Sequence, residues 1–377
     1  MQTPVKSVAL NALFLAPGES GGPETYLRQL VPALADEYPG VRLVVFTTGR
    51  GRRALAGAGW HDFADVRSLP TEEYRRVRRQ LCEQLALPVA ARRAGVELVH
   101  SLASTGPLRG PGLAMVLTLH DVIFTQHATF GRATTWGLNR VVPGAARRAD
   151  SLIVASASAR DEICSVLRLD PGRFTVVPHG VGPVPRVEPA DEAVVRAKLG
   201  LERRRVVLCL AALRPHKNQE VLVRAAGSLP DDVAIVLAGH QERYAERVKE
   251  LASELAVTDR VRIVGYVTDP EVESLWSMAG CGVFPTLTEG FGLPILEGLA
   301  RGVPIACSDI PVLREVGGDV PRYFEPHDPA AAAAAITTSL GDRERGRLGV
   351  ERASRFSWSD AARGTMEAYE RASIASR

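Results

Sequence analysis

The chain has 377 residues, enough for two or three domains that each bury a core of their own. With 46% hydrophobic and 24% charged residues and a mean hydropathy of zero, its composition excludes a disordered chain and a small disulfide-stapled scaffold. No apolar run approaches the roughly 20 residues that span a bilayer. The net charge is +3, and we expect no nucleic-acid partner.

The cysteines are scattered along the chain and form no C-x-x-C pair: Cys82, Cys164, Cys209, Cys281 and Cys307. Their odd number and wide spacing argue against a disulfide framework and against a zinc site. An apolar stretch follows Lys6, but the flanking residues favour a buried first strand over a signal peptide. We therefore expect a protein of the reducing cytoplasm.

Short aliphatic and β-branched runs alternate with helical patterns along the whole chain, which is typical of parallel sheets covered on both faces by helices. In the first half the predicted strands are 5–15, 41–46, 96–101, 113–119, 151–155 and 174–178. In the second half they are 205–213, 233–239, 261–266, 281–285 and 303–307. Each series predicts one doubly wound α/β sheet.

The first predicted strand is followed by the segment GESGGP at 18–23. A helical pattern comes next, with Tyr26, Leu27, Leu30 and Leu34 on one face. Gly21 and Gly22 let backbone amides approach a phosphate or a sugar, although the segment lacks the full G-x-G-x-x-G fingerprint. A merely flexible loop is the alternative.

Positive charge is concentrated in the first half of the chain. Residues 1–180 hold 21 Lys and Arg against 15 Asp and Glu, a net of +6, and the remainder holds 25 against 28, a net of −3. Part of the excess lies in a predicted helix that carries Arg75, Arg76, Arg78, Arg79, Arg92 and Arg93 together with Leu81, Leu85 and Leu87. One interpretation is a solvated helix face, and the other is a surface that docks on anionic lipid or on an anionic acceptor.

His120 and Asp121 follow the predicted strand 113–119. A histidine at the carboxyl end of a strand can donate a hydrogen bond to a sugar oxygen or stabilise developing charge, and Asp121 can orient it or occupy a turn. No third histidine or cysteine stands at ligand spacing, so we expect no metal. In the irregular segment 122–140, Phe124, Phe130 and Trp136 either form an acceptor wall or pack the loop.

Residues 179–193, HGVGPVPRVEPADEA, are rich in Pro and Gly and predict a linker near the middle of the chain. His179 and Gly180 lie at this hinge. Two α/β domains in tandem place ligands at the carboxyl ends of their strands, here in the cleft between the domains.

Arg214 and Lys217, in LAALRPHKNQE, come directly after the first strand of the second half. Two cations at a strand-to-helix turn suit a diphosphate, because Arg engages two oxygens at once and Lys supplies a compact charge. Further along, Tyr266 and Val267 come after the residues VRIV at 261–264 and could contact a flat base by main-chain atoms and ring stacking. A core aromatic is the alternative for Tyr266.

The segment TEGFGLPILEGLARG at 288–302 follows the strand 281–285. Pro294 and Gly302 predict a helix of about two turns that begins near Gly292. Its first backbone N–H groups, next to Gly290 and Gly292, make an anion site that a ligand can approach closely. Glu289 before the helix and Glu297 on it can engage different parts of one ligand, whereas a capping acid and a solvated acid are the alternative.

Taken together, these residues resemble the retaining glycosyltransferases of the GT-B fold, in the glycogen-synthase-like family 4 (group 1) that uses nucleotide-activated sugars. The resemblance spans nearly the whole chain. It rests on the Gly21–Gly22 loop, His120–Asp121, the R-x-x-K-N segment from Arg214 to Asn218, the Glu289 and Glu297 pair around GFGLP, the VVPHG hinge and the terminal FSWSDAARGTMEAYE.

The resemblance implies two Rossmann-like doubly wound parallel-sheet domains that face a central cleft. The N-terminal, acceptor-binding domain would comprise residues 1–182 plus a crossover helix at about 357–377, which begins at Trp358, and the nucleotide-sugar-binding domain would comprise 183–356. It also implies a transferase that needs no cofactor or metal and retains the anomeric configuration, with the leaving phosphate assisting deprotonation of the acceptor.

The family's roles carry over to matching positions. Arg214 and Lys217 would bind the donor diphosphate, Glu297 the ribose, and Glu289 with the backbone of Gly290, Phe291, Gly292 and Leu293 the sugar hydroxyls. His120 would lie against the donor sugar, and Gly21 and Gly22 would close over the phosphates. Two departures stand out: His179 replaces the usual Asn of the hinge, and Ala211 and Ala212 stand where a glycine commonly precedes the R-x-x-K segment.

The expected partners are a nucleotide-sugar donor and a sugar or lipid-linked acceptor, and the basic N-terminal domain favours peripheral contact at the inner membrane face during assembly of bacterial envelope polysaccharide or glycolipid. A soluble acceptor such as an aminocyclitol is the first alternative. The others are a sugar-nucleotide epimerase of the same fold, a pyridoxal-phosphate-dependent glycan phosphorylase and a two-domain solute-binding protein.

Overall fold

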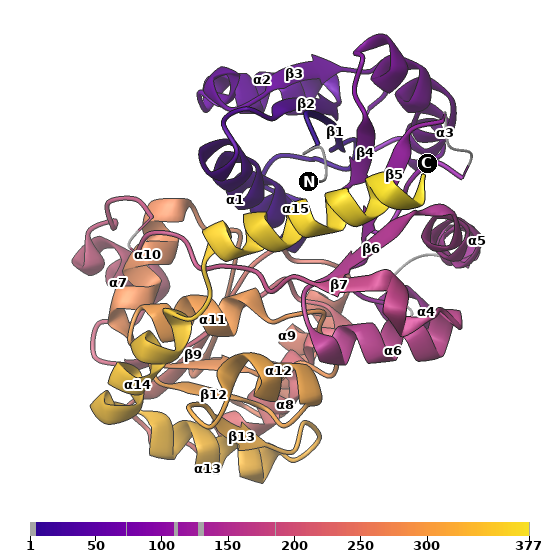
Figure 1. The fold of residues 1–377 in the computed structure, drawn as a ribbon. Coiled ribbons are helices and arrows are strands. Elements are labelled where there is room, and N and C mark those ends of the chain that lie inside the picture. The colour runs from indigo at the N-terminus through magenta and orange to yellow at the C-terminus, as the bar shows by residue number, and fades with distance from the viewer. Residues whose placement is uncertain (1–4, 73, 109–111, 127–131, 185, 377) are drawn as a thin grey trace. The chain divides into compact units, whose positions relative to one another are not determined.

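The computed structural model describes residues 5–72, 74–108, 112–126, 132–184 and 186–376. The chain forms two compact units. Unit 1 contains the chain up to Gly180, apart from residues 126–129, together with the C-terminal segment from Ser357. Unit 2 contains Val181–Phe356 and residues 126–129. Each unit is built on one sheet whose paired strands all run parallel (Figure 1).

Unit 1 has a seven-stranded sheet in the order β3-β2-β1-β4-β5-β6-β7. Its strands are β1 (Ser7–Asn11), β2 (Arg42–Thr47), β3 (Asp65–Ser68), β4 (Leu98–Ser101), β5 (Ala114–Thr118), β6 (Ser151–Val154) and β7 (Phe174–Val176). Its helices are α1 (Gly22–Glu37), α2 (Gly49–Gly57), α3 (Arg76–Arg93), α4 (Ile123–Gln126), α5 (Arg132–Arg148), α6 (Ala157–Leu167) and α15 (Trp358–Ala375), with 3-10 turns η1 (Trp60–Asp62) and η2 (Pro171–Arg173).

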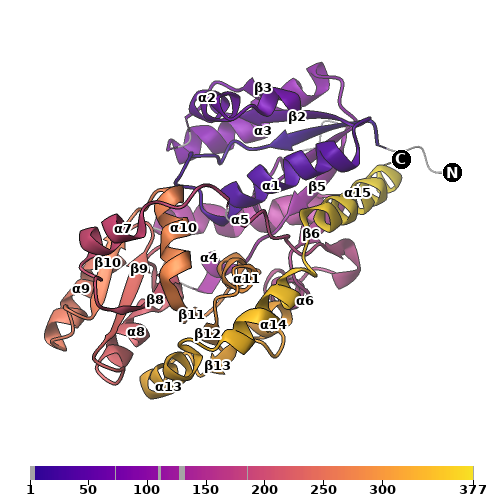
Figure 2. The same cartoon turned by 90° about the vertical axis from the view of Figure 1, so that its left-hand side faces the viewer.

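Helices cover both faces of this sheet, as Figure 2 shows from the side. Neighbouring strand residues point to opposite faces, so Val99 packs in the core cluster under α3 while His100 reaches α15. Side chains of α5 and α6 form a second cluster with Leu117 and Leu152, and α15 lies along α1 and crosses β5, β6 and β7. The sheet is therefore doubly wound, with α1 and α15 on the face opposite α3.

Unit 2 has a six-stranded sheet in the order β10-β9-β8-β11-β12-β13. Its strands are β8 (Arg205–Leu210), β9 (Val233–Ala238), β10 (Val261–Gly265), β11 (Ala279–Phe284), β12 (Ile305–Ser308) and β13 (Arg322–Phe324). Its helices are α7 (Glu192–Leu199), α8 (Gln219–Ala226), α9 (Tyr244–Glu254), α10 (Asp269–Met278), α11 (Leu293–Ala300), α12 (Pro311–Gly317), α13 (Pro329–Ser339) and α14 (Arg343–Ala353), with a 3-10 turn η3 (Pro215–Lys217).

The unit 2 core lies on both faces of its sheet. Helices α8, α9 and α13 pack on one face around Val207, Ile235 and Leu237. On the other face Trp276 of α10 packs against α11 so closely that a Cβ at Gly298 would lie 2.9 Å from its ring. This tight contact positions α11, which carries the strongest sequence motif.

All eleven predicted strands are confirmed, and the predicted α/β class with two doubly wound parallel sheets is correct. The sequence did not indicate β3 or β13. Both are short edge strands whose sequences, DVRS and RYF, contain no run of aliphatic residues. The strand order reverses between β1 and β4 in unit 1 and between β8 and β11 in unit 2. Open α/β sheets bind ligands at the carboxyl ends of the strands beside such a switch point.

Candidate functional site

The switch point of unit 2 brings the predicted diphosphate cations next to the predicted sugar-binding carboxylate. Arg214 and Lys217 follow β8 on the turn η3, and Glu289 follows β11. Lys217 Nζ donates a hydrogen bond to Glu289 Oε1, and both side chains are largely shielded from solvent. Two segments 72 residues apart in sequence therefore form one charged cluster.

Backbone bonds hold the two loops of this cluster together. His216 O accepts the N–H of Leu287 at 2.8 Å and the hydroxyl of Thr286 at 3.0 Å. Asn218 adopts a left-handed conformation with φ +55°, and its amide donates to the carbonyls of Pro285 at 3.1 Å and Pro326 at 2.7 Å. Asn218 therefore holds the R-x-x-K-N turn in place, and Arg214 and Lys217 are carried on this turn.

Arg214 has an acidic neighbour that the sequence did not single out. Its Nε donates to Glu242 Oε1 at 2.8 Å, and Glu242 follows β9. Ala211, which stands where a glycine commonly precedes the R-x-x-K segment, lies directly against Gly239: a Cβ at Gly239, with φ +147°, would lie 2.2 Å from Ala211 O. Gly239 therefore allows the chain after β9 to pass close to the chain after β8.

Helix α11 begins as predicted, with Gly292 at its N-cap and Pro294 in its first turn. Gly292 has φ +96°, and a Cβ there would lie 2.8 Å from Leu313 Cδ2, so only glycine fits. The side chain of Phe291 is buried against Phe356, with ring centroids 5.9 Å apart, so the ring packs into unit 2 and not toward a ligand. Helix N-termini carry N–H groups without a partner in the helix, so this end of α11 suits an anion or hydroxyl oxygens.

Glu297 lies one turn into α11 and pairs with Arg186 from the linker segment. Beneath it is a buried ion pair in which Arg301 Nη2 donates to Glu273 Oε1 at 2.5 Å, with side chains only 6% and 4% exposed. Burial raises the pKa of the Glu273 carboxyl, but the hydrogen bonds from Arg301 and the Arg186 backbone outweigh it, so the pKa lies below its usual value. Arg301 also donates to the Glu297 carbonyl at 3.0 Å, which braces the helix turn that carries Glu297.

Tyr266 is 61% exposed at the carboxyl end of β10, so the alternative of a core aromatic is wrong. Its ring lies 5.7 Å from that of His240, which follows β9. Val267 comes next and is half-buried. The exposed ring and the adjacent main chain suit contact with a flat base.

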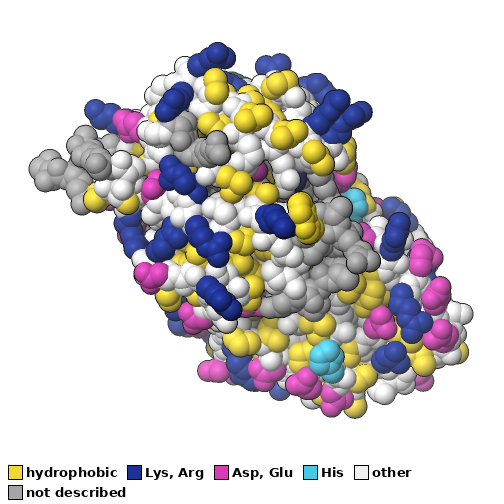
Figure 3. Space-filling view, turned by 90° about the vertical axis from the view of Figure 1, so that its right-hand side faces the viewer, with side chains coloured by type: hydrophobic (Ala, Val, Ile, Leu, Met, Phe, Trp, Pro, Cys, Tyr) yellow, Lys and Arg dark blue, Asp and Glu magenta, His cyan; other side chains and the backbone are white. Residues whose placement is uncertain are grey.

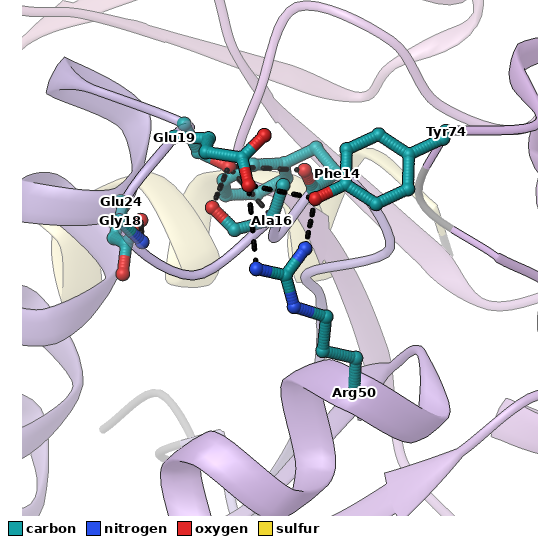
Figure 4. A network of polar contacts seen from close by, with 8 residues as sticks. Phe14, Ala16, Gly18, Glu19, Glu24, Arg50 and Tyr74 are labelled. Atoms are coloured by element: carbon teal, nitrogen blue, oxygen red, sulfur yellow. Dashed lines mark hydrogen bonds and ion pairs between the residues drawn. The ribbon is translucent and has the colours of Figure 1, made fainter. Parts of the chain in front are cut away.

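In unit 1 the segment between β1 and α1 is braced by its own polar side chains (Figure 4). Ser20 Oγ accepts the N–H of Ala16 at 2.7 Å, and Glu24 accepts the N–H of Gly18 at 2.9 Å. Gly21 has φ +59°, and a Cβ at Gly21 or Gly22 would meet no atom within 4 Å. The bracing argues against the merely flexible loop, and the two glycines border open space.

The same segment is tied to the chain before α3. Tyr74 donates its hydroxyl to Glu19 Oε1 at 2.7 Å, and Arg50 approaches the same carboxylate at 3.3 Å and also contacts Tyr74 (Figure 4). These contacts were not predicted, because the three residues lie in segments without periodic pattern.

His120 follows β5 and is oriented by a backbone carbonyl. Its Nε2 lies 2.8 Å from Leu102 O, and because a carbonyl only accepts, the Nε2 proton is fixed there. Burial lowers the pKa of His120, so the ring is neutral and Nδ1 carries a lone pair. In this tautomer Nδ1 can accept a hydrogen bond but cannot donate one, so donation to a sugar oxygen would need the other tautomer. Asp121 accepts the N–H of Ile123 at 3.0 Å and so occupies a turn.

Behind His120 lies a buried aromatic and polar network. Tyr26 of α1 meets the His120 ring edge-on at 5.3 Å, and its hydroxyl lies 3.2 Å from Thr118 Oγ1. His179 stacks on Trp358 with centroids 5.6 Å apart and lies 4.8 Å from Tyr26. The histidine that replaces the usual hinge Asn therefore packs the hinge against α15.

The possible acceptor wall at 122–140 is only partly supported. Phe124 is buried in the unit 1 core and so packs the loop. Trp136 is 63% exposed, with the Arg140 guanidinium 3.8 Å above its ring. Phe130 lies outside the described residues.

All five cysteines are free thiols, and burial raises the pKa of Cys209 and Cys281 to about 12, so neither acts as a nucleophile at neutral pH. Within residues 5–72, 74–108, 112–126, 132–184 and 186–376, no three histidine, cysteine or acidic side chains gather to hold a metal ion. None of the helices in these same ranges is both long enough and apolar enough to cross a membrane.

Two known sequence families match the chain. Residues 20–183 match the family described as Glycosyltransferase Family 4, and residues 191–356 match Glycosyl transferases group 1. O-antigen chain mannosyltransferase B of Escherichia coli is 28% identical over 266 residues, which cover 68% of this chain and 70% of that protein. D-inositol 3-phosphate glycosyltransferase of Nocardia farcinica is 30% identical over 240 residues, which cover 59% of this chain and 53% of that protein.

Solved structures share the fold. HepE of Anabaena, crystallised in complex with UDP-glucose, matches with a TM-score of 0.75 and 18% identity over 96% of this chain and 98% of that one. Similarity at this identity shows the fold alone, which is GT-B. With two parallel-sheet α/β units and family matches along most of its length, the chain belongs to the group 1, family 4 glycosyltransferases.

Proposed function

We propose that the protein is a retaining glycosyltransferase that moves a hexose-type sugar from a nucleoside diphosphate sugar to an acceptor hydroxyl. The observation that carries this proposal is the charged cluster at the unit 2 switch point, where Lys217 pairs with Glu289 beside Arg214 and the N-terminus of α11. This cluster combines groups for a diphosphate with a carboxylate for sugar hydroxyls.

The proposed chemistry needs charge stabilisation above all. Breaking the bond from the anomeric carbon to the phosphate oxygen leaves a cation-like sugar and a diphosphate with added negative charge. Arg214, Lys217 and the first N–H groups of α11 stabilise the leaving group without a metal, and a phosphate oxygen takes the proton of the acceptor hydroxyl. In the free protein Glu242 and Glu289 neutralise the two cations, so the donor displaces these acids as it binds.

The donor roles follow the same arrangement. Glu297 binds the ribose, Tyr266 and Val267 contact the base, and Glu289 with the backbone of 290–293 binds the sugar. Gly21 and Gly22 approach the phosphates, and His120 accepts a hydrogen bond from a sugar hydroxyl through Nδ1 while it stays neutral. The complex of HepE with UDP-glucose makes UDP-glucose the first donor to test.

For the acceptor we propose a growing envelope polysaccharide or glycolipid, which the similarity to an O-antigen chain mannosyltransferase supports. A small soluble polyol is the second candidate, because the related Nocardia farcinica protein is named for D-inositol 3-phosphate. Five free thiols support a reducing cytoplasm as the place of action, with peripheral contact at the inner membrane face.

The first experiment is thermal stabilisation by UDP, GDP, dTDP and ADP and by their sugar conjugates, since a ligand of the folded state raises its stability. We expect one diphosphate to raise the melting temperature, and Arg214→Ala and Lys217→Ala to abolish that rise. Arg343→Ala, an exposed arginine at the start of α14, is the matched control and should leave it unchanged.

Turnover assays then test the chemistry. NMR of the product should show the anomeric configuration of the donor, and EDTA should not reduce the rate. An inverted product would refute retention. If the donor is isomerised without transfer, the epimerase alternative is correct, and stabilisation that survives both cation replacements would refute the diphosphate assignment.

A further inference from the structure

Helix α3 turns its aliphatic side chains outward and its acid inward. Val77, Leu81, Leu85 and Val89 are between 47% and 73% exposed, whereas Glu83 is buried. Asn11 Nδ2 donates to Glu83 Oε1 at 2.6 Å and Thr105 Oγ1 donates to it at 3.1 Å, so the inner face is held by hydrogen bonds as well as by Leu87 and Ala91. Helix α3 therefore has a buried face that includes Leu87 and Ala91, and in addition a row of exposed aliphatic side chains that a solvated helix face does not usually carry.

The four exposed side chains follow one another at i, i+4 spacing, so they form a continuous row on one side of the helix. At 1.5 Å per residue the row from Val77 to Val89 is about 18 Å long. Contiguous apolar rows of this kind are uncommon on a monomer surface and mark a site of contact with another molecule.

The apolar row continues toward α5 through Leu108. The N–H of Leu108 donates to Gln84 Oε1 on α3 at 2.7 Å, and a Cβ at Gly144 on α5 would lie 2.7 Å from Leu108 Cδ2. The exposed Trp136, with Arg140 above its ring, stands on α5. Figure 3 shows this side of the molecule, where hydrophobic and basic side chains are interspersed over unit 1.

Positive charge dominates around the row. The sequences of α3 and α5 contain nine arginines and a single acid, the buried Glu83. Glu72, just before α3, is paired with Arg75. Arg78, Arg92 and Arg93 are exposed on the helix that carries the apolar row.

We propose that the outer face of α3, together with Trp136 and Arg140 of α5, docks on an anionic lipid bilayer. Aliphatic and aromatic side chains enter the acyl boundary while the arginines meet lipid phosphates. A second copy of the chain fits this surface poorly, because a two-fold contact would place arginines against arginines. The proposal assigns a surface to the peripheral membrane contact of the proposed function and rests on that part of it, but it does not depend on transfer itself, since neither donor nor acceptor takes part in docking.

Sedimentation with vesicles tests the proposal on the full chain. We expect binding to vesicles of phosphatidylcholine and phosphatidylglycerol in equal amounts, at least about tenfold weaker binding to phosphatidylcholine alone, and loss of binding as salt is raised. Leu81→Gln with Leu85→Gln, and separately Arg78→Gln with Arg92→Gln, should each weaken binding by about tenfold or more.

The matched control is Val194→Gln, at a position of α7 in unit 2 that is 64% exposed. It should bind vesicles like the wild type. All substituted side chains are exposed, so thermal melts should be unchanged, and nucleotide stabilisation of the Leu81 and Leu85 variant should equal that of the wild type, which keeps this test separate from that of the transferase function.

Three results would overturn the proposal. The first is equal binding to neutral and anionic vesicles, or none to either. The second is wild-type vesicle binding by the Leu81 and Leu85 variant. The third is a wild-type dimer in light scattering that this variant converts to monomer without any vesicle binding, which would make the surface an interface between copies.

Discussion

Replacing His100 with glutamine should flatten the pH dependence of the stability of unit 1. His100 lies on β4 with no exposed surface, and its two ring nitrogens are 2.8 Å from Tyr369 Oη on α15 and 2.8 Å from Thr118 Oγ1 on β5. Burial, with a smaller contribution from His120, lowers the pKa of His100 from 6.5 to about 3. Folding therefore keeps this ring neutral at pH values where the unfolded chain is protonated.

The magnitude follows from linkage. Because the folded pKa is depressed, the stability is fully present above the unfolded pKa of 6.5 and is lost as the pH falls toward 3. Between about pH 7.5 and pH 5 the loss from His100 alone is about 2 kcal/mol, or about 30-fold in the unfolding equilibrium. His179 and His120, whose pKa values are also lowered by burial, add to the loss in the same direction.

Native-state hydrogen exchange followed by mass spectrometry is the suitable assay, because it reports each unit separately. In the wild type, peptides from β4 and α15 should lose protection at the lower pH after correction for intrinsic exchange rates. In His100→Gln the pH-dependent increase in exchange rate of these peptides should be about 30-fold smaller than in the wild type. His61→Gln, at an exposed histidine, should behave like the wild type. Equal pH dependence in wild type and His100→Gln would refute the reasoning.

Three further predictions concern packing and the donor site. Gly180→Ala should lower the free energy of unfolding by about 3 kcal/mol or more, because the new Cβ would lie 2.1 Å from Trp358 N. Gly40→Ala places its Cβ where no atom lies within 4 Å, so it should change the melting temperature little. Similar melting temperatures for the two variants would contradict this prediction. Arg301→Ala should lower the free energy of unfolding, measured in urea, by about 3 to 5 kcal/mol, because it leaves the buried Glu273 carboxylate without its partner. Arg314→Ala, which removes an exposed ion pair with Asp309, should lower it by about 1 kcal/mol or less. If the two losses are equal, the buried pair is not the cause. In calorimetry Glu289→Gln should change the affinity for UDP by no more than about threefold but weaken the binding of the UDP-sugar by about tenfold, because a hydrogen bond to a charged group contributes about 1.5 to 3 kcal/mol. An equal loss of affinity for both ligands would place Glu289 at the phosphates instead.

Local patterns in the sequence were sufficient for the class of fold and for the motif-bearing turns. Buried parallel strands need continuous aliphatic runs, and these were visible at every central strand. Pro294 and the flanking glycines likewise marked helix α11, because a helix start and a left-handed backbone leave chemical signatures in single residues. Strands β3 and β13 were missed because their sequences, DVRS and RYF, carry no aliphatic run, whereas the other two edge strands, β7 and β10, were predicted.

Aliphatic runs and the residues that follow them were enough to predict two doubly wound α/β units and the residue types at the ends of their strands. Which groups meet became clear from the folded chain: Glu289 pairs with Lys217, Glu297 with Arg186, and the proton of His120 points to Leu102. The same fold places one face of α3 outside, so that Leu81 and Leu85 are exposed while Leu87 is buried. The physical reason is that strand and helix patterns depend on neighbours within a few residues, whereas ion pairs, tautomers and exposed faces depend on contacts between segments that are far apart in the chain.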